Sequence, residues 1–332
     1  EYMSYDEMLF SATLSVAVPT YFINSGSRQN MARPGPEGSF VTSGVYCAMV
    51  GTRLEKPGAM EWQHVVITPE QNTPAKGYGA DAPPHLESTR LLRLWARAYG
   101  LPAFPTFEEA SSAVGADGGE FGELVRLGRD VIFNVGAYKA RMRFCVEPFL
   151  MHANAAARDA GKSAYVFVVG LGLGVWSLDK TLQATALVQL YDELLTELDL
   201  PHVRDVVFSY FPPSVVACGR AANGQPHPGA AQRGHTTTIH FGRTDPAAPM
   251  PAAEEGAEER LLVAQYAWDG NSYPGNEFWL GSLAGSGDPA AACCSGISEL
   301  QNPSINDHML RRAMAYPSAR NVETPPYPSS LS

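Results

Sequence analysis

The chain has 332 residues, enough for one large domain or two small ones with an ample hydrophobic core. Its apolar fraction of 45% and charged fraction of 17% are typical of a globular protein and not of a disordered one. A formal net charge of −10, with no local cluster of Lys and Arg, argues against nucleic-acid binding. No apolar run is as long as the roughly 18 residues of a transmembrane helix, so we expect no membrane span.

The cysteines and histidines predict neither a disulfide framework nor a metal site. Five cysteines, at positions 47, 145, 218, 293 and 294, are odd in number and follow no spacing pattern. That usage is typical of a reducing compartment, and it predicts a cytoplasmic protein with free thiols. The eight histidines form no H-x-x-x-H pair and there is no C-x-x-C, so we predict no metal and no cofactor.

In the first half of the chain, predicted strands come first and predicted helices follow, separated by Pro- and Gly-rich loops. Strands are predicted at 13–18, 21–23, 41–50 and 62–68, and helices at 85–99, 123–130 and 138–160. Pro148 is expected to kink or split the last helix. The small and polar residues at 111–120 indicate a weak boundary, so we expect an elaboration at 1–115, a core at 116–315 and an extended tail at 316–332.

The segment 165–176 predicts the centre of the fold. It is an unbroken apolar run rich in Val, as expected for a strand buried on both faces of a mostly parallel sheet. Gly170, Gly172 and Gly174 then end it, and a helix is predicted at 178–198 with Asp179 in its first turn. Strand, glycine loop and helix together aim backbone N–H groups at a phosphate or diphosphate. A tight turn whose glycines serve only packing is the alternative.

The spacing of these glycines argues against the common nucleotide-binding motifs. A dinucleotide fingerprint needs a third glycine where this chain has Val175, and an acid at the end of the next strand. The next strand, 205–211, ends in Pro212-Pro213 instead. No Gly-Lys-Ser/Thr follows the loop, so it is not a Walker motif. We therefore favour a diphosphate site of another kind over a nicotinamide-dependent oxidoreductase.

A second apolar strand, 261–268, runs directly into the polar loop 269–279. Polar residues after a central strand lie at the carboxyl edge of the sheet, where open α/β sheets bind ligands, so we expect the two loops to face one crevice. The side chains suited to sugar hydroxyls are Asp269, Asn271, Asn276 and Glu277, and a carboxylate here can act as a general base or stabilise an oxocarbenium-like centre. A simple Asp-Gly-Asn turn is the alternative, and for Asp288 helix capping and catalysis both remain open.

These two stretches resemble the ligand loops of macrodomains. Val-Gly-Leu-Gly-Leu-Gly-Val-Trp at 169–176 is similar to their diphosphate loop, and Ala-Gln-Tyr-Ala-Trp-Asp-Gly-Asn with Pro-Gly-Asn-Glu at 264–277 is similar to their ribose and catalytic loop. The combination most resembles the MavL-like family of atypical macrodomains, named for a bacterial effector that removes ADP-ribose from arginine. The resemblance implies a macrodomain-like, three-layer α/β/α sandwich with a mixed sheet and amino-terminal elaborations. Because the Gln-Glu-Glu signature of poly(ADP-ribose) glycohydrolases is absent, it does not imply cleavage of that polymer.

The implied function is hydrolysis of mono-ADP-ribose from a protein side chain, with arginine as the acceptor. Asp269, Glu277 and Asp288 would be catalytic, and Asp269 and Asn271 would hold the distal ribose. The partner is ADP-ribose or an ADP-ribosylated protein; the alternative is a non-catalytic ADP-ribose reader or a structural component of a larger assembly. The remaining expected ligand contacts are Gly170, Leu171, Gly172, Leu173, Gly174, Val175, Trp176, Gly275 and Asn276.

Overall fold

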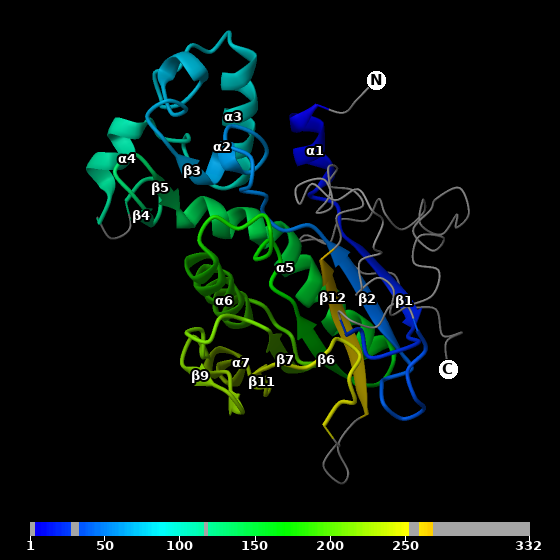
Figure 1. The fold of residues 1–332 in the computed structure, drawn as a ribbon. Helices are drawn as coiled ribbons and strands as arrows, with labels where there is room; N and C mark the ends of the chain where they lie inside the picture. Colours follow the sequence, from blue (N-terminus) through cyan, green and yellow to red (C-terminus); the bar gives the residue numbers. More distant parts are fainter. Residues whose placement is uncertain (1–3, 28–32, 116–118, 252–258, 268–332) are drawn as a thin grey trace.

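A computed structural model describes residues 4–27, 33–115, 119–251 and 259–267, and a mixed seven-stranded sheet lies at its centre (Figure 1). Strands β2, β12, β6, β7 and β11 are mutually parallel, and β1 and β10 pair antiparallel to them at the two edges. The predicted α/β class with a mixed sheet is therefore confirmed. In spatial order the strands are β1 (Val16–Tyr21), β2 (Ser43–Met49), β12 (Arg260–Ala267), β6 (Ser163–Val168), β7 (Val203–Ser209), β11 (Thr238–Gly242) and β10 (Gln225–Pro226).

Strand β6 is the middle strand of this sheet, as its unbroken apolar run predicts. All six of its residues are buried, and it pairs in parallel with β12 on one side and β7 on the other. Side chains alternate between the two faces of a strand. Val166 and Val168 belong to one hydrophobic cluster, and Tyr165 and Phe167 belong to another. Each face of the sheet therefore has its own core.

Helices α5 (Val135–Asp159) and α6 (Lys180–Glu197) cover the first face (Figure 1). The side chain of Asn134 caps α5 by accepting a hydrogen bond from the N–H of Ala137, at 2.8 Å. The expected split at Pro148 is wrong, because α5 continues through it as one helix of 25 residues; the kink stays a prediction. Proline removes one backbone hydrogen bond, but burial of Cys145 and Val146 before it and of Phe149 and Leu150 after it stabilises the helix on both sides.

The second face carries a smaller aromatic cluster. Tyr46 of β2 stacks on Tyr266 of β12 with 5.2 Å between ring centroids, and Phe22 contacts Tyr46 edge-on. Ala247, from the segment after β11, is fully buried in the same cluster. The sheet therefore has packed layers on both sides, consistent with the expected three-layer sandwich.

A smaller unit lies beside the amino end of α5, in the upper part of Figure 1. Its antiparallel sheet has the order β3-β5-β4. Two predictions fail here: 62–65 is a helical turn and not a strand, and Leu124–Arg126 is a strand and not part of a helix. The second failure follows from a tight turn at Gly128, which lets 124–126 pair with 132–134. The unit comprises α2 (Trp62–Val65), β3 (Val66–Ile67), α3 (Glu87–Ala98), α4 (Phe107–Ala113), β4 (Leu124–Arg126) and β5 (Ile132–Asn134).

No helix in the described ranges is both long and apolar enough to cross a bilayer.

The remaining short elements lie outside the two sheets and helices described above or connect them. Strands β1 and β2 join the main sheet, whereas the smaller unit lies between β2 and α5 in the chain; the boundary at residue 115 stays a prediction. The short elements are α1 (Tyr5–Ser11), η1 (Pro74–Lys76), β8 (Ala217–Cys218), β9 (Ala221–Ala222) and α7 (Pro228–Gln232).

Candidate functional site

The two strands that precede the predicted loops, β6 and β12, end at the same carboxyl edge of the sheet. Strands β6 and β12 are neighbours and run in the same direction, with Phe167 opposite Ala264. The glycine loop leaves β6 at this edge, and the polar loop begins where β12 ends, at Ala267. Asp269, Asn271, Gly275, Asn276, Glu277 and Asp288 lie outside the described residues, so their roles stay predictions.

A buried glutamine joins the ends of these two strands. Gln265 of β12 is 1% exposed, and its side-chain oxygen accepts a hydrogen bond from the N–H of Val169, at 3.2 Å. Its amide nitrogen lies 2.7 Å from the hydroxyl of Tyr191 and 3.4 Å from the sulfur of Met49. Gln265 therefore fixes the start of the glycine loop relative to the end of β12. Sequence reasoning missed this residue, although a glutamine inside an apolar strand is itself a signal.

The glycine loop is anchored by its large side chains and close packing. Leu171, Leu173 and Trp176 are buried. The loop lies directly against the segment that follows β2: a Cβ on Gly172, whose φ is +69°, would meet the carbonyl oxygen of Thr52 at 2.7 Å. The carbonyl of Trp176 also accepts a hydrogen bond from the N–H of Leu54, at 2.9 Å. Packing therefore explains Gly172 by itself.

The outer part of the loop remains accessible. Gly174 is exposed, Gly170 and Val175 are half-buried, and a Cβ on Gly174 would meet nothing within 4 Å. The N–H groups of Leu171 and Leu173 are used inside the loop, by the carbonyls of Val169 and Gly170. Within the described part of the chain, the amides of Gly174 and Val175 have no such internal partner. The same holds for the amide of Gly170, so three of the seven loop residues predicted to bind a ligand have accessible positions and amides not used by the described backbone.

The amino end of α6 is closed by its own side chains. Asp179 caps the helix by accepting from the N–H of Leu182, at 2.9 Å. The side-chain oxygen of Gln183 accepts from the N–H groups of Leu178 and Asp179, at 2.8 and 3.1 Å. These three N–H groups are therefore not available to an anion, and the Asp179 carboxylate at the cap repels one, so a phosphate at this edge would depend on the loop more than on the helix terminus.

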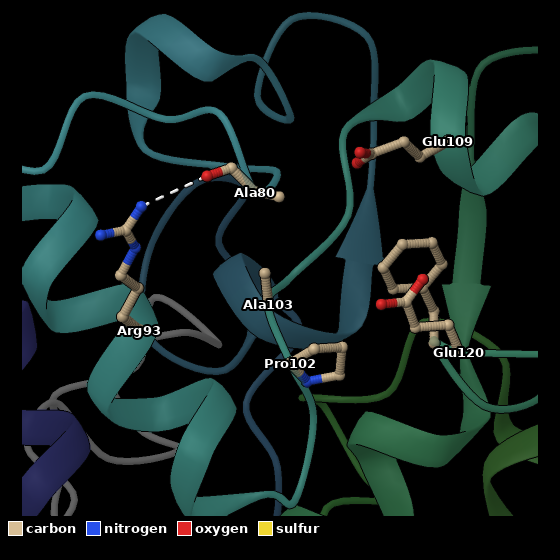
Figure 2. Close-up of a pocket in the computed structure, with 7 residues that line it drawn as sticks. Ala80, Arg93, Pro102, Ala103, Glu109 and Glu120 are labelled. Carbon is tan, nitrogen blue, oxygen red and sulfur yellow. Dashed lines mark hydrogen bonds between the residues drawn. The ribbon is translucent and has the colours of Figure 1, made fainter.

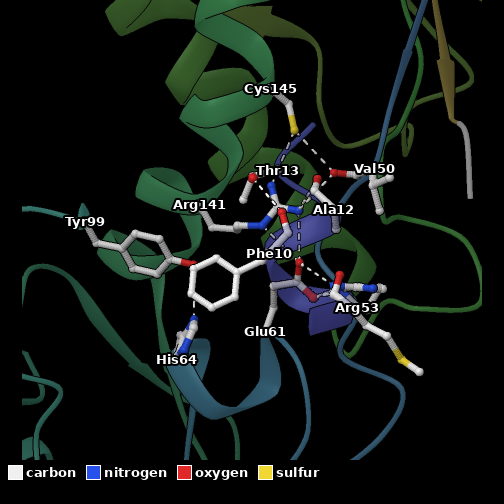
Figure 3. A network of polar contacts seen from close by, with 11 residues as sticks. Phe10, Ala12, Thr13, Val50, Arg53, Glu61, His64, Tyr99, Arg141 and Cys145 are labelled. Carbon is white, nitrogen blue, oxygen red and sulfur yellow. Dashed lines mark hydrogen bonds and ion pairs between the residues drawn. The ribbon is translucent and has the colours of Figure 1, made fainter. Parts of the chain in front are cut away.

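Beneath the segment after β2 lies a fully buried ion cluster of Arg53, Glu61 and Arg141 (Figure 3). Arg53 Nε and Arg141 Nε lie 2.9 and 3.0 Å from the two carboxylate oxygens of Glu61. Burial alone would raise the pKa of Glu61, but the two guanidinium groups hold it below its usual value. Glu61 is therefore a carboxylate at neutral pH.

The same cluster connects separate parts of the chain. Arg53 donates to the carbonyl of Met8 at 3.2 Å, and Arg141 donates to the carbonyls of Ala12 and Val50, both at 3.2 Å. It thus joins α1, the segment after β2 that contains Arg53, and α5 (Figure 3). The sequence gives no sign of this cluster, since the two arginines are far apart in the chain and neither belongs to a motif.

One further side chain stands out at the carboxyl edge. Tyr210 directly follows β7, has a φ of +59° and is 55% exposed. Its N–H donates to the carbonyl of Gly242 at 3.0 Å, and its hydroxyl donates to Asp245 at 3.2 Å. Sequence reasoning took this residue only as part of a strand.

Among the residues that the structure describes, Asp192, Cys218 and His227 place possible metal-ligand atoms within 4.8 Å of one another. Nδ1 of His227 accepts a hydrogen bond from the N–H of Ala230, so the ring proton is on Nε2, which donates to Asp192 at 2.8 Å. Neither nitrogen then has a lone pair for a metal. Burial also raises the pKa of the Cys218 thiol well above its usual value, which keeps it protonated. The group thus serves as a structural contact between α6 and α7.

A pocket of about 280 Å³ lies in the smaller unit, between α3, α4 and the segment before β4 (Figure 2). Two of its three polar side chains already serve the fold: Arg93 donates to the carbonyls of Ala80 and Ala82, and Glu109 accepts from Thr106 in the capping box of α4. No residue predicted from the sequence to bind a ligand lines it. The carboxyl edge of the main sheet remains the candidate site.

Comparison with known proteins assigns the family. A sequence model described as "ADP-ribosylhydrolase MavL-like" matches residues 1–320. Two proteins of Drosophila melanogaster are similar: ADP-ribosylarginine hydrolase CG3568 is 35% identical over 322 residues, and ADP-ribosylarginine hydrolase CG2909 is 34% identical over 311. The matches cover 94% and 92% of this chain, but 59% of each relative, so the chain spans less than two thirds of their length. The chain belongs to the MavL-like ADP-ribosylhydrolase family.

Proposed function

We propose that this chain forms a macrodomain-like pocket that hydrolyses mono-ADP-ribose from arginine side chains of proteins. One observation supports the proposal: β6 and β12 are adjacent and parallel, so the glycine loop leaves the sheet at the same edge at which β12 ends. Open α/β sheets bind ligands at this edge. Family membership and the names of the two Drosophila relatives support arginine as the acceptor.

The diphosphate of ADP-ribose would bind to the glycine loop. The amides of Gly170, Gly174 and Val175 are the candidate donors, because these positions are exposed or half-buried and the described backbone does not use their N–H groups. Leu171, Leu173 and Trp176 would act indirectly, because their buried side chains hold the loop in place. Backbone amides suit an acidic protein, since they bind phosphate without a cluster of basic side chains.

The polar loop would supply the chemistry. Asp269 and Asn271 would bind the distal ribose, with Gly275 and Asn276 shaping the loop around it. Glu277, with Asp269 or Asp288, would take a proton from the attacking water as a new C–O bond forms at the anomeric carbon. The bond from that carbon to the arginine nitrogen breaks, and the proton that the carboxylate took from the water passes to this nitrogen as the guanidinium leaves. The products are ADP-ribose and unmodified arginine, and no step in this scheme uses a metal.

The test is release of ADP-ribose from a protein modified on arginine. We expect release by the wild-type chain and a loss of at least about 100-fold, the contribution of one acid–base group, in Glu277→Gln. Asp269→Asn and Asp288→Asn are tested singly. Because asparagine can still cap a helix, loss of turnover in Asp288→Asn would indicate catalysis, and full turnover would indicate capping. A protein modified on serine is the control substrate.

Two outcomes would contradict this proposal in different ways. Binding of free ADP-ribose without any release identifies a reader that kept the pocket and lost turnover. Full turnover in all three variants would show that the reaction uses other residues.

A further inference from the structure

The strand that follows β6 in the sheet ends in an exposed aromatic ring. Tyr210 is the first residue after β7, and β7 pairs with β6 through Val168 and Phe208. Both aromatic neighbours turn inward, since Phe208 is 0% and Phe211 is 8% exposed, while the Tyr210 side chain points out. This reversal takes place at a φ of +59°, a region that residues other than glycine rarely occupy.

The fold fixes this ring in position before any ligand binds. The backbone N–H of Tyr210 is held by the carbonyl of Gly242, and its hydroxyl donates to Asp245. Asp245 is itself held, because its other carboxylate oxygen accepts from the hydroxyl of Ser25 at 3.0 Å. Glycine would adopt this backbone with less strain. The ring is exposed and is held by a strained backbone conformation, and such residues cluster at functional sites, so we infer a functional contact for it.

The order of the strands indicates what this ring would meet. Strands β12, β6 and β7 are consecutive in the sheet, with about 4.8 Å between neighbours. The proposed function places the distal ribose beside the end of β12 and the diphosphate beside the end of β6. ADP-ribose is a linear molecule, so its remaining end, the adenosine, extends toward β7.

We propose that Tyr210 stacks on the adenine base of bound ADP-ribose. The proposal rests on the proposed function and adds to it the residue that recognises the base. A planar purine and an exposed phenol ring associate through their faces, and this contact tolerates different bases, so Tyr210 would add affinity more than base specificity.

Calorimetric titration of the whole chain tests this contact with two ligands. ADP-ribose carries the base, and ribose 5-phosphate does not. Tyr210→Gly removes the ring and relieves the backbone, so we expect its thermal midpoint to stay at or above that of the wild type. Its affinity for ADP-ribose should fall about tenfold or more, the usual effect of losing one base–aromatic stack. Its affinity for ribose 5-phosphate should not change.

Two other variants separate the ring from its hydroxyl and from general surface effects. Tyr210→Phe keeps the ring and loses the bond to Asp245, so we expect it to bind ADP-ribose within about threefold of the wild type. Tyr21→Ala is the matched control, because Tyr21 is 62% exposed but pairs with Ser43 at the opposite, amino edge of β2. It should bind both ligands as the wild type does.

Wild-type affinity for ADP-ribose in Tyr210→Gly would overturn the inference and leave the proposed function standing. Equal losses for both ligands would also overturn it, because the effect would then not pass through the base. Failure of the wild-type chain itself to bind ADP-ribose would instead refute the proposed function, and this inference with it.

Discussion

The side-chain oxygen of Gln265 accepts a hydrogen bond from the backbone N–H of Val169, across the gap between β12 and β6. This contact lies just beyond the last paired residues of the two strands, Ala264 and Phe167. The same side chain reaches Tyr191 of α6 and Met49 of β2. One buried amide thus fixes the start of the glycine loop relative to the end of β12, on which the proposed site depends.

Gln265→Leu should therefore affect both stability and binding. The change leaves the Val169 amide without its partner, and we expect the free energy of unfolding to fall by about 1–3 kcal/mol. It should also weaken ADP-ribose binding, because the start of the glycine loop is no longer tied to β12. Urea unfolding and calorimetric titration measure the two effects.

Tyr191→Phe is the control for this prediction. It removes one contact of Gln265 and keeps the bond to Val169, so we expect some loss of stability with unchanged affinity for ADP-ribose. Wild-type affinity in Gln265→Leu would show that the bond does not position the loop.

What the sequence could predict depends on how local the signal is. The buried strand β6, its glycine loop and β12 follow from apolar runs and turn residues that are adjacent in the chain. The role of Gln265 could not be predicted, because its partners come from β2, β6 and α6. The same holds for Glu61, because its partners Arg53 and Arg141 meet it only in the folded chain. The catalytic positions from 269 to 288 lie outside the described residues and stay predictions.

The glycine loop allows a comparison of two glycines in one turn. Gly172→Ala places a Cβ against the backbone of Thr52 in a left-handed conformation, so we expect it to destabilise the fold by at least about 2 kcal/mol. Gly174→Ala adds a methyl group in open space, and it should change stability by less than about 1 kcal/mol. Thermal or urea unfolding of the pair checks this, and equal stabilities would contradict the close packing of Gly172.

The cluster of Arg53, Glu61 and Arg141 predicts a large effect from a small change. Glu61→Gln keeps the shape of the side chain but leaves two buried guanidinium charges without a counter-charge, so we expect a loss of about 3–5 kcal/mol. Glu197→Gln is the control: Glu197 pairs with Arg143 at the surface, and its replacement should cost less than about 1 kcal/mol. If the two variants unfold at the same urea concentration, the buried cluster does not stabilise the fold.

One buried histidine, His64, and one half-buried histidine, His152, predict how stability depends on pH. Burial lowers the pKa of His64 to about 3 and that of His152 to about 4. Because an unfolded histidine titrates near pH 6.5, the unfolded chain binds more protons than the folded chain between that value and about pH 4. Stability should therefore fall as the pH drops through this window, by up to about 1.4 kcal/mol per pH unit for each histidine.

His64 gives the sharper test of this dependence. Its ring stacks on Phe104 with 4.8 Å between centroids, and its Nδ1 lies 3.1 Å from the hydroxyl of Tyr99. His64→Phe combined with Tyr99→Phe removes the titrating group without leaving an unpaired hydroxyl. We expect the slope of unfolding free energy against pH to decrease by up to about 1.4 kcal/mol per unit, measured by urea unfolding between about pH 6 and about pH 4.5. The control is His85→Gln, at an exposed position, which should keep the wild-type slope. An unchanged slope in the double variant would show that His64 becomes protonated in the folded chain.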